Sequence, residues 1–149
     1  MTDSAKSAQE HAPPASRSAH SANRRTIRIA TLNDDPTILF AAEELEKYLR
    51  RITGGTAVRV IEETYSPQSE TLWVGCADAF DDIELPPVDN AGLDDAISIA
   101  VADRSGIITG ANPRAALIAA YWYLRELGCR WIRPGADGEV LPAIADPLA

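Results

Sequence analysis

One stretch, from Asn112 to Pro134, constrains the fold more than any other because it combines a capped helix with a concentration of aromatic residues. Asn112 is a favourable N-cap, Pro113 suits the first helical position, and Gly128 stands where helices commonly end in a left-handed residue. These signals predict a helix of about 15 residues. Residues 129–132 then predict a short strand, which the following Pro-Gly pair ends.

The faces of this predicted helix indicate how deeply it lies in the fold. Six apolar side chains recur at helical spacing, namely Ala116, Leu117, Ala120, Tyr121, Leu124 and Leu127. Ile118, Trp122 and Tyr123 cover much of the opposite side. A helix that is apolar on two sides is buried on most faces, so we expect the rest of the domain to pack around it.

The first 25 residues differ in composition from the rest of the 149-residue chain. They contain no Leu, Ile, Val or aromatic residue, and therefore cannot offset the entropy cost of ordering. We predict that residues 1–25 form a disordered tail. The remainder is apolar enough for one domain with its own core. We expect that domain to span residues 26–142, with residues 143–149 as a C-terminal tail or the start of a linker.

Charge and histidine content exclude several classes of function. The whole chain carries a net charge of -8, and residues 26–149 carry 10 basic and 20 acidic side chains, which argues against nucleic acid as a partner. Both histidines, His11 and His20, lie in the tail. A Ser/His/Asp triad, a Cys/His pair or a His-rich metal site would therefore need a disordered residue. We predict no metal and no cofactor.

The sequence also bears on compartment and redox state. The tail lacks an apolar run long enough for the core of a secretory signal, and no membrane-spanning stretch follows. We therefore expect a soluble, cytoplasmic protein without a membrane partner. Cys76 and Cys129 are the only cysteines. They could form one disulfide, but two reduced core residues are the preferred interpretation.

Upstream of the capped helix, the pattern predicts several strands and one further helix. A strand at Thr26–Ala30 alternates polar and apolar residues, and a helix begins at Asp35-Pro36 and ends at Gly54-Gly55. The apolar face of that helix comprises Ile38, Ala41, Ala42, Leu45, Leu49 and Ile52. Four further strands are predicted at Thr56–Ile61, Thr71–Val74, Ala96–Val101 and Gly106–Thr109. The last two should form a hairpin through the turn at residues 103–106.

These elements define an expected fold class. The order β-α-β-β-β-β-α-β, with paired neighbours as well as crossovers, predicts an α/β (α+β) fold. We expect a mixed β-sheet of five or six strands with two main helices packed on it.

Residues 78–95 interrupt the regular pattern with seven acidic side chains, no basic one and a Pro-Pro breaker. A long acidic surface loop is the preferred interpretation. The cluster could instead hold a hard cation such as calcium, but the spacing of an EF-hand loop is missing. Glu43-Glu44 and Glu62-Glu63 could be proposed as catalytic carboxylates for glycoside hydrolysis. Adjacent residues on a helix point in different directions, so solvated surface charges explain the first pair more simply.

Several motifs resemble a known family over residues 26–142. They are Ala41-Ala42-Glu43-Glu44-Leu45, Tyr48-Leu49, Ile52-Thr53-Gly54, Leu72-Trp73-Val74-Gly75, Ile108-Thr109-Gly110, Asn112-Pro113-Arg114, Leu124, Glu126-Leu127-Gly128-Cys129-Arg130-Trp131, Pro134-Gly135, Gly138-Glu139 and Leu141-Pro142. The sequence resembles the small α/β domain that precedes the catalytic barrel in microbial α-glucuronidases and related glycoside hydrolases. That domain is itself similar to the second domain of β-N-acetylhexosaminidases.

The resemblance implies a non-catalytic accessory domain of a carbohydrate-active enzyme. In these families the barrel carries the catalytic carboxylates, so no catalytic residue transfers to this chain. The implied partner is a glycosidase barrel, in cis or in trans. Ala115 departs from the family, which usually has glycine there, so we expect a close contact at this position to be relaxed.

Asn112 and Arg114 are the candidate ligand-binding residues. A helix N-terminus after a glycine-ended strand can bind an anion, and Arg114 would add a fork-shaped donor for a sugar carboxylate. The alternative is structural: Asn112 caps the helix, and Arg114 pairs with a nearby acid.

The remaining candidates are a set of aromatic and basic residues at the exit of the second helix. The candidates for a domain interface are Trp122, Tyr123, Arg130, Trp131 and Arg133. We expect part of this surface to be exposed and apolar in the isolated chain. The alternative is a stand-alone carbohydrate-binding module that uses Arg114 and exposed aromatic rings.

Overall fold

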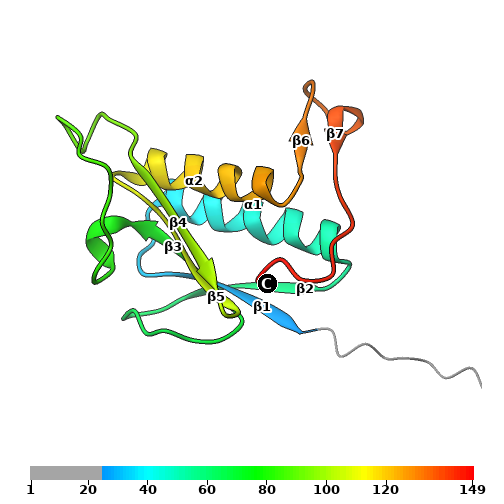
Figure 1. Cartoon of the computed structure of the whole chain (residues 1–149), viewed down its shortest axis with the longest axis horizontal. Helices are drawn as coiled ribbons and strands as arrows, with labels where there is room; N and C mark the ends of the chain where they lie inside the picture. The colour runs from blue at the N-terminus through cyan, green and yellow to red at the C-terminus, as the bar shows by residue number, and fades with distance from the viewer. Residues whose placement is uncertain (1–24) are drawn as a thin grey trace, which may run out of the picture.

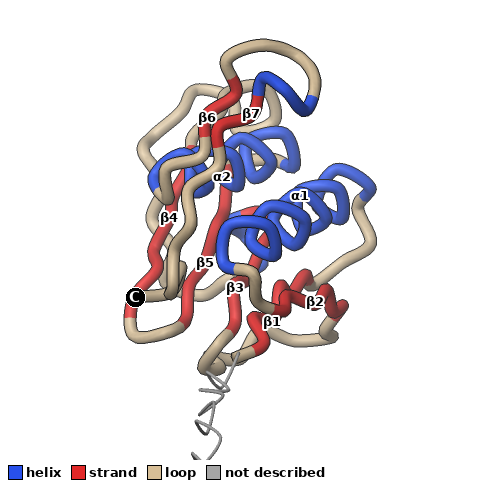
Figure 2. Tube along the Cα trace, turned by 90° about the vertical axis from the view of Figure 1, so that its right-hand side faces the viewer, coloured by secondary structure: helices blue, strands red, loops and turns tan. Residues whose placement is uncertain are grey.

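The computed structural model describes residues 25–149, so the predicted disorder of the tail falls almost entirely outside the described residues. Two helices lie together on one face of a five-stranded sheet (Figures 1 and 2). The elements are β1 (Thr26–Thr31), α1 (Pro36–Thr53), β2 (Thr56–Ile61), β3 (Thr71–Cys76), β4 (Ile97–Ala102), β5 (Ser105–Gly110), α2 (Pro113–Glu126), β6 (Arg130–Trp131) and β7 (Glu139–Val140). The predicted α/β class, with a mixed sheet and two packed helices, is confirmed.

The strand order in the sheet is β2-β1-β3-β5-β4. β1, β2, β3 and β5 run parallel, and only β4 is antiparallel to its neighbour, β5. The predicted hairpin is present, with Asp103 and Arg104 at φ values of 50° and 67°. Two consecutive residues with positive φ form the type of tight turn that matches the twist of antiparallel strands.

Both helices begin and end where their capping residues predict. At the start of α1 the Asp35 carboxylate accepts hydrogen bonds from the backbone N–H of Thr37 and Ile38, at 2.8 and 3.2 Å. At its end Gly54 adopts a left-handed conformation, with φ of 61°. The Asn112 side chain caps α2 by accepting from the Ala115 N–H at 2.9 Å.

The sheet separates two apolar layers. The larger layer lies between the sheet and the helices, and it includes Ile29, Leu45, Leu49, Leu72, Val74, Ile108, Ala119, Ala120 and Leu124. The smaller layer lies on the other face, where Trp73 packs edge-on against Tyr65, and Tyr65 against Phe80. β3 stands between both layers and is buried over its first five residues, as expected for an interior strand.

The short strand after α2 does not join the main sheet. The sequence predicts a strand over residues 129–132, and the strand is Arg130–Trp131. It pairs with β7 as a separate antiparallel ribbon that projects beyond the helix layer (Figure 1). The sequence predicts no strand at β7, which consists of one charged and one apolar residue directly after Gly138.

The last residues of the chain pack onto the domain. Leu148 is fully buried, and the Tyr123 hydroxyl donates a hydrogen bond to the carbonyl oxygen of Pro147. Arg104 bridges the carboxylates of Glu70 and Asp146. Residues 143–149, predicted as a C-terminal tail or the start of a linker, thus contact the domain through Asp146, Pro147 and Leu148.

Gly110 occupies a position where no side chain fits. A Cβ atom there would lie 2.5 Å from both the carbonyl carbon and the Cβ atom of Ala115. We expect Gly110→Ala to lower the free energy of unfolding by about 1–3 kcal/mol, because β5 and α2 would have to separate. Urea denaturation would measure the change, with Gly92→Ala in the surface loop as a control that leaves stability within about 0.5 kcal/mol of the parent.

The C-terminal ion pairs make stability depend on acidic pH. Hydrogen bonding to Arg104 lowers the pKa of both Glu70 and Asp146 in the folded state. A carboxyl with a lowered pKa stabilises the fold above its unfolded pKa, and this contribution disappears as the pH falls through the folded value. In thermal unfolding between pH 7 and pH 2, Asp146→Asn should show a shallower loss of stability than the parent chain; equal acid slopes would contradict this role.

Candidate functional site

Aromatic and charged side chains gather where α1, α2 and the β6–β7 ribbon meet. Trp131 lies at the centre: its indole N–H donates to the Tyr48 hydroxyl at 2.9 Å. Its ring also packs edge-on against Tyr48 and Tyr121, with ring centroids 5.2 and 5.3 Å apart. Such edge-to-face pairs add to the free energy of burial. Trp131 thus fixes the ribbon to both helices.

Two carboxylates complete this cluster. The Tyr48 hydroxyl donates to Glu139 Oε1 at 2.6 Å, and Arg51 pairs with the other oxygen of Glu139. On the α2 side, the Tyr121 hydroxyl donates to Glu44 Oε2 at 2.6 Å. The hydrogen bond from Tyr48, followed by that from Arg51, lowers the pKa of Glu139. We call Glu44, Tyr48, Tyr121, Trp131 and Glu139 the ribbon clamp.

The ribbon clamp is built for structure rather than for proton transfer. Burial, followed by the hydrogen bond to Glu139, raises the pKa of Tyr48. Burial likewise raises the pKa of Tyr121, with Glu44 as the next cause. Tyrosines with raised pKa values stay protonated at neutral pH and act as hydrogen-bond donors. A general acid or base works best with a pKa near the operating pH.

An exposed surface borders the ribbon clamp. Trp122 is 43% exposed, Ile132 75% and Val140 51%. The Arg125 guanidinium lies 4.5 Å from the centre of the Trp122 ring, a cation–π geometry. Next to it is a groove of about 530 Å³, which is lined by Arg125, Arg130, Trp131, Ile132 and Val140. We call these five residues and Trp122 the Arg–Trp surface.

The predicted interface residues therefore have different surroundings. Trp122 is exposed and Trp131 half-buried, whereas Tyr123 is only 4% exposed and lies in the core against Pro147. Arg130 donates to the carbonyl oxygens of Arg125 and Cys129, at 2.6 and 2.7 Å, and the first of these carbonyl groups belongs to the last turn of α2.

The fifth interface candidate lies further out on the ribbon. Arg133 pairs with Asp137 at 2.7 Å, across the turn of the ribbon. Both side chains are largely exposed. An ion pair of this kind contributes little to stability.

Asn112 and Arg114 occupy the places that the structural alternative predicts. The Asn112 amide donates to the carbonyl oxygens of Ala91 and Asp94, both at 3.0 Å, while its oxygen caps α2. Arg114 Nε pairs with Asp95 Oδ1 at 2.9 Å. Both residues thereby hold the acidic loop against α2, and their polar groups are engaged within the chain.

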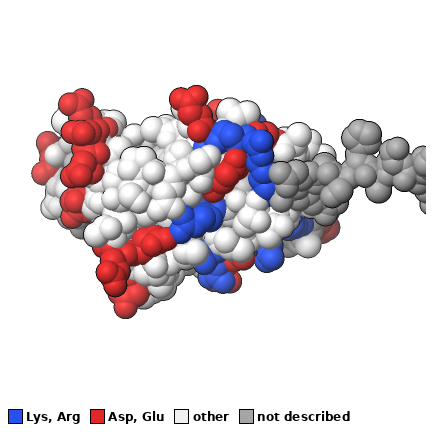
Figure 3. Space-filling model, turned by 90° about the horizontal axis from the view of Figure 1, so that it is seen from below, with Lys and Arg blue, Asp and Glu red and all other residues white. Residues whose placement is uncertain are grey.

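The acidic loop, residues 78–95, carries seven acidic side chains. Figure 3 shows acidic side chains concentrated at the end of the molecule where this loop lies in Figure 1. Within residues 25–149, no three His, Cys, Asp or Glu side chains converge on a point where they could hold a metal ion.

The glutamate pairs that sequence reasoning considered do not converge on a common point. In the first pair, Glu43 lies 3.8 Å from Arg59, whereas Glu44 belongs to the ribbon clamp. In the second pair, Glu62 forms an ion pair with Arg28.

Both cysteines are free thiols, as the preferred interpretation predicts. Burial raises the pKa of Cys76 and also that of Cys129. A raised pKa keeps a thiol protonated and unreactive at neutral pH.

The sequence pattern does not predict the polar half of the ribbon clamp. Glu44 accepts a hydrogen bond from Tyr121, which is 77 residues away along the chain. Glu139 accepts one from Tyr48, which is 91 residues away. One local signal existed: Glu44 and Tyr48 are four residues apart on the buried side of α1, so they form one row of that helix.

Comparison with models of known protein families found no match to this sequence, and a search of curated proteins found no relative. Neither helix among residues 25–149 has the length and apolar character that crossing a membrane requires.

The ribbon clamp can be tested with Tyr48→Phe. Removing the hydroxyl leaves the Trp131 N–H and one oxygen of Glu139 without a partner, which should cost about 1–3 kcal/mol of unfolding free energy. Urea denaturation followed by tryptophan fluorescence would measure the loss. Tyr65→Phe is a matched control, because the Tyr65 hydroxyl makes no hydrogen bond within residues 25–149. Equal effects of the two substitutions would contradict the clamp.

Proposed function

We propose that this chain is a non-catalytic accessory domain of a glycoside hydrolase, which packs against a catalytic barrel and supports its sugar site. The Arg–Trp surface is the proposed contact. The observation that carries the proposal is the exposure of Trp122, Ile132 and Val140 side by side with arginines. Aromatic residues and arginine are enriched at protein interfaces and often dominate their binding energy.

The engagement of the acidic side chains supports a non-catalytic role. Glu44 and Glu139 are held by tyrosines, Glu70 by Arg104, and Glu46 by Arg59. A glycosidase needs two carboxyl groups that flank the scissile bond at a defined separation. Carboxylates that serve as partners of structural donors fit a scaffold better than a reaction centre.

The second candidate function is carbohydrate binding by the chain itself. The exposed ring of Trp122 favours it, since the apolar faces of sugars pack on aromatic rings, and Arg125 lies beside that ring. Arg114 supports it less, because Asp95 and the Leu93 carbonyl engage its guanidinium.

The two candidates predict different results for Trp122→Ala. As an interface residue, Trp122 should contribute about 2–4 kcal/mol to the binding of a purified hexosaminidase-type or α-glucuronidase-type catalytic barrel. Isothermal titration calorimetry would measure this as a roughly 30-fold or greater loss of affinity. Leu93→Ala, which truncates a 69% exposed apolar residue in the acidic loop, is the matched control and should leave the affinity unchanged.

Three results would decide against the proposal. Turnover of aryl glycosides by the purified chain would overturn the non-catalytic role. Binding of oligosaccharides that disappears in Trp122→Ala would favour the second candidate. Equal losses of barrel affinity in Trp122→Ala and Leu93→Ala would show that the Arg–Trp surface is not the contact.

A further inference from the structure

A second open surface lies along the free edge of β2. β2 is an outer strand of the sheet, with β1 as its single neighbour. It is six residues long, contains no proline, and carries one charged residue, Arg59. Such an edge presents unpaired backbone groups and is a ready template for pairing with another strand.

The hydrogen bonding of β1 shows which backbone groups face outward. The N–H of Glu62 donates to the carbonyl oxygen of Thr31 at 2.8 Å. In a parallel strand, every second residue directs both its N–H and its C=O to the same neighbouring strand. The backbone groups of Val58 and Val60 therefore also face β1. The N–H and C=O groups of Ala57, Arg59 and Ile61 therefore point away from the sheet.

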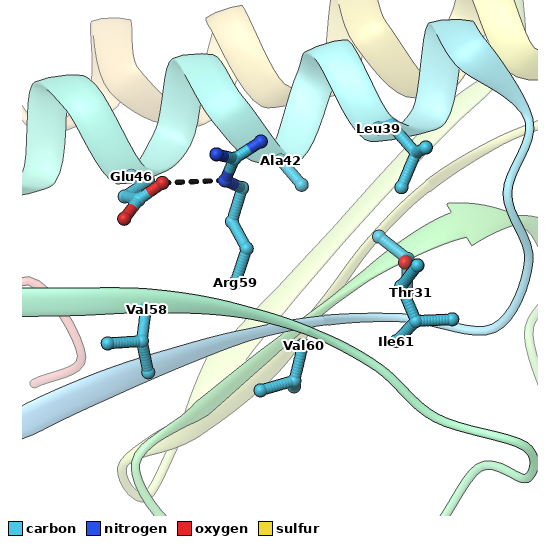
Figure 4. A pocket seen from close by; sticks show the side chains of 8 residues that line it. All are labelled: Thr31, Leu39, Ala42, Glu46, Val58, Arg59, Val60 and Ile61. Atoms are coloured by element: carbon cyan, nitrogen blue, oxygen red, sulfur yellow. Dashed lines mark hydrogen bonds and ion pairs between the residues drawn. The ribbon is translucent and has the colours of Figure 1, made fainter.

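A groove accompanies this edge on the helix side. It has a volume of about 540 Å³ and is lined by Thr31, Leu39, Ala42, Glu46, Val58, Arg59, Val60 and Ile61 (Figure 4). Figure 4 shows Arg59 reaching from β2 to Glu46 of α1, at 2.6 Å. Ile61 is 62% exposed.

We propose that the β2 edge pairs with β2 of a second copy of this chain, antiparallel about a twofold axis at Arg59. The three residues whose backbone groups point outward, Ala57, Arg59 and Ile61, are spaced symmetrically about Arg59. This register therefore places Ala57 of one copy opposite Ile61 of the other. All three pairs are then of the hydrogen-bonded type, which gives about six intermolecular hydrogen bonds. The two sheets join into one, and the same patch serves both copies.

Charge complementarity supports a second copy as the occupant. Arg59 would meet its counterpart at the axis, but each guanidinium is held by Glu46 of its own chain. Glu43 is 59% exposed and only 3.8 Å from the same guanidinium, so it can also face Arg59 of the other copy. Two arginines near four carboxylates form a self-complementary cluster. This pairing does not depend on the Arg–Trp surface, whose residues are different.

Sedimentation velocity of the full chain from about 1 to 500 µM tests the proposal. We expect a monomer–dimer equilibrium in which Arg59→Pro raises the dissociation constant at least tenfold. Proline removes the outward N–H at the axis, and no hydrogen bond to β1 is lost. Arg59→Ala, which keeps that N–H, should weaken the dimer less. Circular dichroism and the thermal midpoint of each variant would check that the monomer remains folded.

Two further measurements identify the edge itself. Ile61→Lys changes an exposed residue and should also weaken the dimer at least tenfold, even if Arg59→Pro fails to fold. Hydrogen exchange should show concentration-dependent protection of the Arg59 and Ile61 amides in the parent chain. A monomer at all concentrations, or a dimer that survives Ile61→Lys without protection of these amides, would overturn the proposal.

Discussion

The burial of β3 between two apolar layers is the constraint on which the rest of the structure depends. Leu72 and Val74 belong to the layer under the helices, and Trp73 points into the layer on the opposite face. A strand that is buried on both faces needs neighbours on both edges, because its backbone groups cannot reach water. β1 and β5 supply them. Both helices then cover one face, and the loops that carry Tyr65 and Phe80 cover the other.

The helix layer in turn positions the ribbon and determines which aromatic residues remain exposed. Tyr121 of α2 and Trp131 of β6 pack against α1, where Glu44 and Tyr48 offer them hydrogen-bond partners. Trp122 has no such partner on α1 and lies on the outer side of α2 beside Arg125. Trp122 takes no part in the ribbon clamp and therefore stays exposed beside the ribbon.

The two proposed contacts use different parts of the molecule and different interactions. The Arg–Trp surface offers apolar area and guanidinium groups, which suit a folded partner with a complementary surface. The β2 edge offers backbone hydrogen bonds, which require a partner strand. Since the two surfaces share no residue, a chain paired through β2 would still present Trp122 to another domain. An accessory domain that joins two copies of a larger assembly would need both surfaces, the β2 edge for the second copy and the Arg–Trp surface for the catalytic domain.

The sequence by itself determined the elements and their ends, because caps, turns and periodicity are local: Asp35, Asn112 and Gly54 act within a few residues of their own positions. Only the tertiary structure decided that the ribbon leaves the sheet, that Leu148 is buried, and that Tyr123 faces inward while Trp122 faces outward. Those outcomes depend on contacts such as that between Tyr48 and Glu139, 91 residues apart. No local pattern encodes which of two apolar faces will find a partner.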